Sequence, residues 1–269
     1  MTDYQKLLNN ITQLKDEIDQ FRPLDQAQVK LLEQQIRLEH VWSSNAIEGS
    51  TLSMNETASI LNTGMTVHGM SLKEAMEAVD LAAAYDYMSE LVSKHTPLSE
   101  RIIRDLNRLA MIKNSDPHTA GAYRVVEAWP YGSEYQPYVS PFDIQPRMHA
   151  LIEWVHTASD QLHPVECAAE LHERLVAIHP FADGNGRTAR LVMNLALTEA
   201  GYPVINIQPD AKARQAYMDA LGHARSTGDL LPFKVLIGNY VQETLENRID
   251  LLRRNEDYIA EAQSESDLF

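Results

Sequence analysis

Apolar residues recur at alternating steps of three and four through most of the chain, which is the period of an amphipathic helix. The first stripe, over residues 4–21, is heptad-like but too short to predict a coiled coil, so we expect a helix docked on the core. Arg22-Pro23 breaks this pattern, and a second helical pattern begins near Asp25. A third stripe precedes an acidic tail, residues 261–269, whose composition predicts disorder. The apolar positions of the three stripes are Leu7, Ile11, Leu14, Ile18 and Phe21; Val29, Leu32 and Ile36; and Val241, Leu245, Ile249 and Leu252.

The run over residues 191–197 has few polar breaks, and a helix that is apolar on most sides is a buried one. Gly201 and Pro203 follow as stop signals, because glycine ends helices readily and proline cannot continue them. We therefore expect the central helix of the fold here, with Gly184-Asn185-Gly186 at its N-terminus.

The composition changes over residues 113–147, where turn residues separate two short stretches rich in β-forming residues. Tyr123–Val126 and Tyr135–Val139 flank Pro130–Ser133, which predicts a β-hairpin, and the prolines make it an edge element. An exposed edge can accept a further strand from a partner protein. The predicted fold class is therefore mainly all-α, with one small hairpin.

Residues 179–190, HPFADGNGRTAR, gather several chemical groups at the start of the predicted central helix. Glycines let backbone N–H groups turn toward a ligand, and a helix N-terminus attracts anions. Arg187 and Arg190 are three residues apart, so both can reach one phosphate chain. Asp183 is a hard oxygen ligand suited to Mg²⁺, and His179 titrates near neutrality and could accept a proton from a hydroxyl. These are the parts of a phosphate-transfer site.

Two other phosphate or metal motifs fail on this sequence. A Walker A loop requires a glycine where Phe181 stands and a lysine where Arg187 stands. A zinc-protease helix beginning at His172-Glu173 requires a histidine where Val176 stands.

The same twelve residues resemble the signature of the Fic family (filamentation induced by cAMP), H-x-F-x-D/E-G-N-G-R-x-x-R, at every specified position. The resemblance implies a Fic-type helical bundle and a protein adenylyltransferase, which transfers AMP from ATP to a Ser, Thr or Tyr hydroxyl of a target protein. By this resemblance His179 is the catalytic base and Asp183 holds Mg²⁺. Gly184, Asn185, Gly186 and Arg187 bind the α- and β-phosphates, and Arg190 binds the γ-phosphate.

The resemblance also divides the chain. It covers a Fic core over 40–240, and the helical stripes outside it give N-terminal helices over 1–39 and a C-terminal helix with the acidic tail over 241–269. Within the core it implies an inhibitory helix around 43–49, a flap over 121–140 that aligns the target, and the Fic loop over 179–190. Trp129 would lie near the nucleotide and Tyr217 would hold the adenine, although Arg225 stands where the family often has an asparagine.

Glu48 is unusual on the residues alone, because an acid near a helix C-terminus meets the negative end of the dipole unless a cation faces it. The segment Ser44 to Glu48-Gly49 resembles the inhibitory motif of the Fic family, S/T-x-x-x-E-G/N. By that resemblance Glu48 pairs with Arg190 and keeps it from the γ-phosphate, so the enzyme is autoinhibited without a separate antitoxin.

Charge and composition narrow the partners. The net charge of −15 over 269 residues argues against a nucleic-acid-binding surface. The single cysteine excludes an internal disulfide, and no apolar run predicts a signal peptide or a membrane span. We therefore expect a soluble, cytoplasmic protein that uses ATP and a target protein, which could be a second copy of itself, and the sequence leaves a homodimer open.

Two other functions stay open at this level. Glu48 could instead position a water that removes AMP from a modified protein. Alternatively, the chain could be a non-catalytic interaction module that ATP binding controls, although such a module has no need of a base at position 179.

Overall fold

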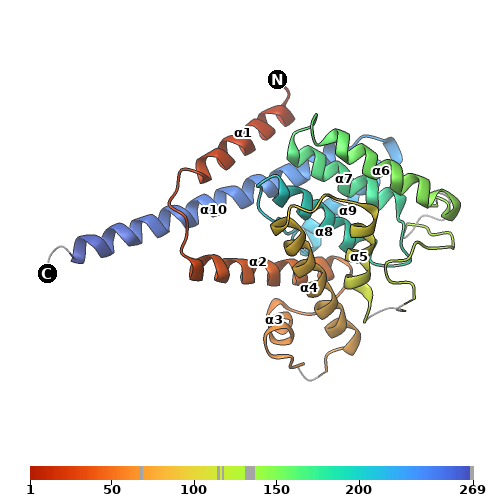
Figure 1. Cartoon of the computed structure of the whole chain (residues 1–269), viewed down its shortest axis with the longest axis horizontal. Helices are drawn as coiled ribbons and strands as arrows, with labels where there is room; N and C mark the ends of the chain where they lie inside the picture. Colours follow the sequence, from red (N-terminus) through yellow and green to blue (C-terminus); the bar gives the residue numbers. More distant parts are fainter. Residues whose placement is uncertain (67–68, 114–115, 117, 131–136, 267–269) are drawn as a thin grey trace.

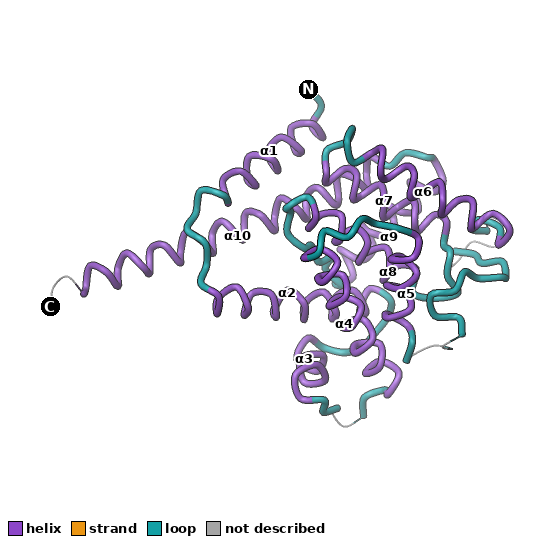
Figure 2. The backbone as a smooth tube through the Cα atoms, in the orientation of Figure 1, coloured by secondary structure: helices purple, strands orange, loops and turns teal. Residues whose placement is uncertain are grey.

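The computed structural model describes the chain except residues 67–68, 114–115, 117, 131–136 and 267–269. Its described residues form ten α-helices and one short 3-10 helix, and no β-strand (Figures 1 and 2). The elements are α1 (Asp3–Ile18), α2 (Gln26–Ile47), α3 (Met54–Thr63), α4 (Leu72–Ser93), α5 (Glu100–Met111), η1 (Pro141–Asp143), α6 (Ile144–Ala158), α7 (Pro164–Ile178), α8 (Asn185–Glu199), α9 (Ala211–Thr227) and α10 (Leu231–Ser266). The mainly helical fold predicted from the periodicity is confirmed.

Helix starts follow the local sequence. Thr2, Asp25 and Ser53 each cap a helix with a side-chain oxygen that accepts a hydrogen bond from the backbone three residues later. In each case the residue at that third position returns a hydrogen bond to the cap, which completes a capping box. The predicted break at Arg22-Pro23 and the new helix near Asp25 are therefore both found.

The first helix is docked on the body, as its short stripe predicts. Ile11 of α1 is fully buried in a cluster that includes Val241 and Leu245 of α10. Gly238 allows this close approach, since a Cβ there would lie 2.8 Å from a methyl group of Leu7. Figure 1 shows α1 beside α10, while the far end of α10 extends away from the body.

Helix α8 is the central element of the fold. Leu191, Val192 and Leu195 belong to a buried cluster shared with α4, α5, α6 and α7. Met193 and Leu197 face a second cluster, which contains residues of α1, α7, α9 and α10. The N-terminus of α8 is consequently fixed from several sides, which makes it a rigid base for a site.

The predicted flap differs from a regular hairpin in its described part, residues 121–130 and 137–140. One backbone hydrogen bond joins its arms, from Tyr138 N–H to the Ala128 carbonyl at 2.9 Å. The guanidinium of Arg124 instead donates to the carbonyls of Val126 and Val139, which a strand ladder would have used. The turn predicted at 130–133 lies largely outside the described residues.

The prediction for the acidic tail needs correction over residues 261–266. Helix α10 continues to Ser266, so the backbone there is helical rather than disordered. The segment has no glycine or proline and contains good helix formers, which favours continuation of the helix.

The proposed domain limits at residues 40 and 240 fall inside α2 and α10. These limits therefore divide the sequence but do not coincide with the ends of helices. Within the described part, no helix combines the length and the apolar character that a membrane crossing requires.

Candidate active site

The 179–190 loop joins α7 to α8 through two left-handed residues. His179 ends α7 with φ 53° and ψ 58°, and Gly184 caps α8 with φ 76°. A left-handed histidine is uncommon, and such strain persists where the surrounding structure enforces it. Glycine is required at 184 for a second reason, because a Cβ there would lie 2.5 Å from the sulfur of Met111. The first N–H groups of α8 follow this turn and, as at any helix start, have no partner within the helix.

Asn185 stabilises the loop with its side chain. Its Oδ1 accepts a hydrogen bond from the Phe181 N–H at 2.9 Å, and its Nδ2 donates to the Phe181 carbonyl at 2.8 Å. The residue is buried and both ends of its amide bond to Phe181, so the side chain is committed to the loop. Only the backbone N–H of Asn185 is left for the phosphate contact that the resemblance implies.

Asn107 of α5 is a structural residue of the site that the sequence did not identify. Its Nδ2 donates to the Asp183 carbonyl at 3.0 Å and to Thr188 Oγ1 at 3.1 Å. Its Oδ1 accepts a hydrogen bond from the Gly121 N–H at 2.9 Å. One buried amide thus ties the loop, the first turn of α8 and the base of the flap together. Its only sequence signal is a polar residue on the apolar face of α5.

Arg190 is buried, and four of its contacts hold the guanidinium. Nε donates to Ser44 Oγ at 2.8 Å, and Nη2 donates to the Ser44 carbonyl at 2.9 Å and to Glu48 Oε1 at 2.7 Å. Nη1 lies 3.4 Å from the Tyr217 hydroxyl. Ser44 and Glu48 at the end of α2 therefore hold the Arg190 cation. This cation faces Glu48 and offsets the unfavourable interaction of an acid with the negative end of the helix dipole.

Glu48 stays ionised in this contact. Burial by itself raises the pKa of its carboxyl, but the charge and hydrogen bond of Arg190, together with the charges of Arg187 and Arg214, lower the pKa below its usual range. The Glu48 carboxylate also lies directly over Gly186, where a Cβ would collide with Oε1. The acid therefore covers the start of α8 as well as one arginine.

Tyr217 is buried beneath Arg190. Its hydroxyl shares a hydrogen bond with His172 Nε2 at 2.9 Å, and its ring packs against His172 and Phe233. With 1% of its surface exposed, the ring presents no open face in this conformation. Its contacts indicate a support for Arg190, and the adenine contact stays a prediction. Burial lowers the pKa of His172 to about 3, so this histidine is neutral, as expected of a core residue.

Arg187 is also buried, but it is held only by longer contacts. Its Nη1 lies 3.7 Å from Glu77 of α4, and its Nη2 lies 3.5 Å from Asp183. Its Nε has no hydrogen-bond partner in the described part of the chain. A buried N–H without a partner is costly, so this guanidinium is suited to an anionic ligand that supplies the missing acceptor. Glu77 was not identified from the sequence.

Asp183 has the most open side chain among the charged residues of the loop, with 63% of it exposed. The described residues contain no cluster of three or more acids, histidines or cysteines that could hold a metal alone. Mg²⁺ does not require one, because it is commonly held by one or two carboxylates together with substrate phosphates. An exposed carboxylate beside a helix N-terminus and two arginines fits that mode of binding.

His179 lies between the loop and the flap. Burial and the charge of Arg124 lower the pKa of its imidazole to about 4, so the ring is neutral at pH 7. The Arg124 guanidinium donates to the His179 carbonyl at 2.8 Å, and the Arg124 N–H donates to the Pro180 carbonyl at 2.9 Å. Arg124 thereby joins the start of the flap to the backbone of His179, the candidate general base. Trp129, further along the flap, is about half exposed.

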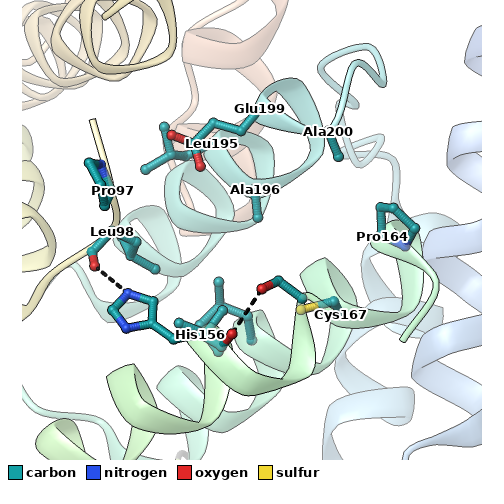
Figure 3. A pocket seen from close by; sticks show the side chains of 12 residues that line it. Pro97, Leu98, His156, Pro164, Cys167, Leu195, Ala196, Glu199 and Ala200 are labelled. Atoms are coloured by element: carbon teal, nitrogen blue, oxygen red, sulfur yellow. Dashed lines mark hydrogen bonds between the residues drawn. The ribbon is translucent and has the colours of Figure 1, made fainter. Parts of the chain in front are cut away.

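A cavity of about 350 Å³ lies at the opposite end of α8 from the loop, between α6, α7 and α8 (Figure 3). Leu98, Val155, Cys167, Leu171 and Leu195 form much of its wall. None of the loop residues lines it, so it is separate from the candidate active site.

Fold and site together define a helical protein with an anion-binding loop at the start of its buried central helix. Residues 97–197 match the model of the Fic/DOC family. The chain is 30% identical to a Fic-domain-containing signaling protein from Bacteroides thetaiotaomicron, whose crystal structure it matches with a TM-score of 0.82 over 91% of this chain and 98% of that one. The chain belongs to the Fic/DOC family.

Curated relatives carry an activity in their names. The chain is 35% identical over 244 residues to the protein adenylyltransferase Fic of Culex quinquefasciatus, covering 90% of this chain and 47% of that protein. It is 31% identical over 258 residues to the protein adenylyltransferase fic-1 of Caenorhabditis elegans, covering 95% of this chain and 49% of that protein. The chain thus spans about half the length of these relatives.

Proposed function

We propose that the protein is an adenylyltransferase that transfers AMP from ATP to a Ser, Thr or Tyr hydroxyl of a target protein, and that Glu48 holds it in an inhibited state. The observation that carries this proposal is the convergence of a neutral His179, an exposed Asp183 and two buried arginines at the N-terminus of α8. The names of the relatives support the same activity.

In this mechanism the target hydroxyl attacks the α-phosphorus of ATP while its proton passes to the imidazole of His179. The bond between the α-phosphorus and the bridging oxygen breaks, and pyrophosphate leaves. The lowered pKa of His179 means that the ring is unprotonated at pH 7 and can accept a proton there. Positioning and charge neutralisation carry most of phosphoryl transfer, so the remaining residues act on the phosphates.

The N–H groups at the start of α8 and the Arg187 guanidinium bind the α- and β-phosphates. The missing partner of Arg187 Nε is the geometric reason for this role. Arg190 binds the γ-phosphate once Glu48 releases it. Asp183 would hold Mg²⁺, which when bound supplies positive charge to the phosphates.

The target docks on the flap, where Arg124 links the flap carbonyls to the His179 carbonyl. A second copy of this chain is one such target, which makes self-modification a direct assay.

The reverse reaction, removal of AMP from a modified protein, has one observation in its favour. The Glu48 side chain is 37% exposed, so water can reach a carboxylate that lies over the phosphate loop. In that reaction Glu48 would orient a water for attack on the phosphorus.

Incubation of the wild type and of Glu48→Gly with Mg²⁺ and α-labelled ATP, followed by intact-mass measurement, tests the proposal. We expect an added AMP mass that is stronger in the variant. If an AMP-modified protein instead loses AMP only when Glu48 is present, the reverse reaction is the function. No mass change in either direction would contradict both.

A further inference from the structure

The His179 imidazole has only weak hydrogen-bond support for its orientation. A histidine that acts as a base is commonly oriented by a hydrogen bond at its second ring nitrogen. The Val176 carbonyl is the backbone acceptor that acts on the His179 ring, but the contact of the buried Nδ1 falls short of full hydrogen-bond geometry. A weak hydrogen bond of this kind leaves room for a second contact to fix the plane of the ring.

Tyr138 provides that contact. Its ring lies against the imidazole with centroids 3.8 Å apart and planes inclined by only 10°. A parallel aromatic neighbour at this distance blocks rotation of the imidazole about its χ2 bond and excludes water from one face. Tyr138 belongs to the second arm of the flap, 41 positions before His179 in the numbering, so no local pattern predicts the pair.

The backbone on both sides of Tyr138 is held by arginines. Arg225 of α9 donates to the Pro137 carbonyl at 2.9 Å, and Arg124 donates to the Val139 carbonyl. The Arg225 guanidinium also lies 4.4 Å from the centre of the Tyr138 ring, a cation–π contact. Arg225, Tyr138 and His179 therefore form a connected stack from α9 to the loop.

We propose that Tyr138 is a positioning residue, which orients the imidazole of His179 for proton transfer, and that Arg225 supports it from α9. The proposal rests on the proposed function in one respect, namely that His179 is the base. It gives the second arm of the flap a role besides target docking, since Tyr138 contacts the ring of the base.

The pKa of His179 depends on the groups around the ring, so it reports whether the Tyr138 ring covers the imidazole. Burial lowers the pKa of His179 first, and the nearby Arg124 and Arg225 lower it further, while the Val176 carbonyl and Glu48 act in the opposite direction. Loss of the Tyr138 ring exposes the imidazole to water and leaves these charges in place. The pKa of His179 should then rise from about 4 toward its ordinary value of about 6.5.

The experiment compares Tyr138→Leu with Tyr138→Phe in the full chain carrying Glu48→Gly. Leucine removes the aromatic face, whereas phenylalanine keeps the face and removes only the hydroxyl. We expect Tyr138→Leu to lower kcat for self-modification about tenfold without changing KM for ATP, and to move the acid limb of the kcat profile to higher pH. Tyr138→Phe should restore both the rate and the profile.

An NMR titration of the His179 ring supplies a readout that does not depend on transfer. The His179 resonance is identified by its absence in His179→Gln. A raised imidazole pKa in Tyr138→Leu, with the parent value in Tyr138→Phe, supports the proposal even if Glu48→Gly transfers no AMP, and the failure would then lie in the proposed function. Identical titrations in all three proteins would overturn the positioning role.

Arg225→Met tests the same stack if Tyr138→Leu does not fold. Methionine keeps an apolar contact with the ring and removes the charge. We expect a smaller loss of kcat in the same direction, with the melting temperature near that of the parent. An unchanged kcat in a folded Arg225→Met protein would remove Arg225 from the proposal.

Discussion

Glu48 and Arg190 lie 142 residues apart in the sequence, and a hydrogen bond of 2.7 Å joins them at the start of the central helix. The same guanidinium donates to the side chain and the carbonyl of Ser44, one turn earlier on α2. Arg190 is therefore held by the end of α2 as a unit, and release of Glu48 alone leaves the guanidinium anchored but available to an anion.

Glu48→Gly should increase self-modification, because Arg190 Nη2 becomes free for the γ-phosphate. The same change removes a hydrogen bond to a charged group, so we expect a cost of about 1–3 kcal/mol in the free energy of unfolding. Intact-mass kinetics and urea unfolding measure the two effects. Glu48→Gln keeps the size and one acceptor oxygen, so it should give an intermediate rate. A rate in Glu48→Gly no higher than in the wild type would contradict the inhibitory role.

His179→Ala should abolish transfer while ATP still binds. A general base commonly contributes about 10²–10⁴ in rate, and the phosphate contacts of the arginines do not involve the imidazole. Rate measurements in the Glu48→Gly background and calorimetry with ATP check the two parts. Retention of cellular function by His179→Ala would favour the non-catalytic interaction module instead.

Asp183→Ala should remove the dependence of ATP binding on Mg²⁺. Since the side chain also accepts a hydrogen bond of 2.6 Å from the Gly184 N–H, we expect the free energy of unfolding to fall by about 1 kcal/mol. Calorimetric titration with ATP, with and without Mg²⁺, is the measurement, and Asp183→Asn serves as the isosteric control. Unaltered Mg²⁺ dependence in Asp183→Ala would show that another group holds the ion.

The free energy of unfolding should decrease as the pH is lowered from about 6.5 to about 4. Burial lowers the pKa of His40 to about 4 and that of His172 to about 3, while unfolded histidine titrates near 6.5. In this window the unfolded chain binds more protons than the folded one, so the free energy of unfolding rises with pH, by up to about 1.4 kcal/mol per pH unit for each group. Urea unfolding at a series of pH values checks the slope.

His40→Gln provides the control for that pH dependence. The slope below pH 6.5 should be shallower in this variant, while the region above pH 7 keeps the slope of the parent. Equal slopes in parent and variant would mean that His40 is not the group that titrates.

Asn107→Leu should destabilise the loop and the flap together. It leaves the Gly121 N–H and the Asp183 carbonyl without their partner, at a cost of about 1–3 kcal/mol for each buried group. Hydrogen exchange should increase at both segments. Asn107→Asp keeps the acceptor for the Gly121 N–H and loses the donor to the Asp183 carbonyl, so exchange should increase mainly in the loop. Equal protection in the parent and in both variants would show that Asn107 does not link the loop to the flap.

The sequence by itself determined the helices and the position of the site. Periodicity, capping residues and stop signals act over three to seven residues, and they predicted a docked α1, the break before α2 and a buried α8. The loop was also predictable, because His179, Asp183 and the arginines are spaced within twelve residues at a helix start. Glu48 could be identified as an acid in need of a cation, since helix termini have a fixed polarity.

The tertiary structure decided which side chains complete that site. Asn107, Glu77 and Tyr138 lie 40 to 110 residues before their partners in the loop, and buried polar groups take whatever partner the packing brings near, which no local period encodes. Packing likewise placed Tyr217 beneath Arg190 and gave the flap an arginine in place of a strand ladder. Local propensity defined the segments, and long-range burial defined their chemistry.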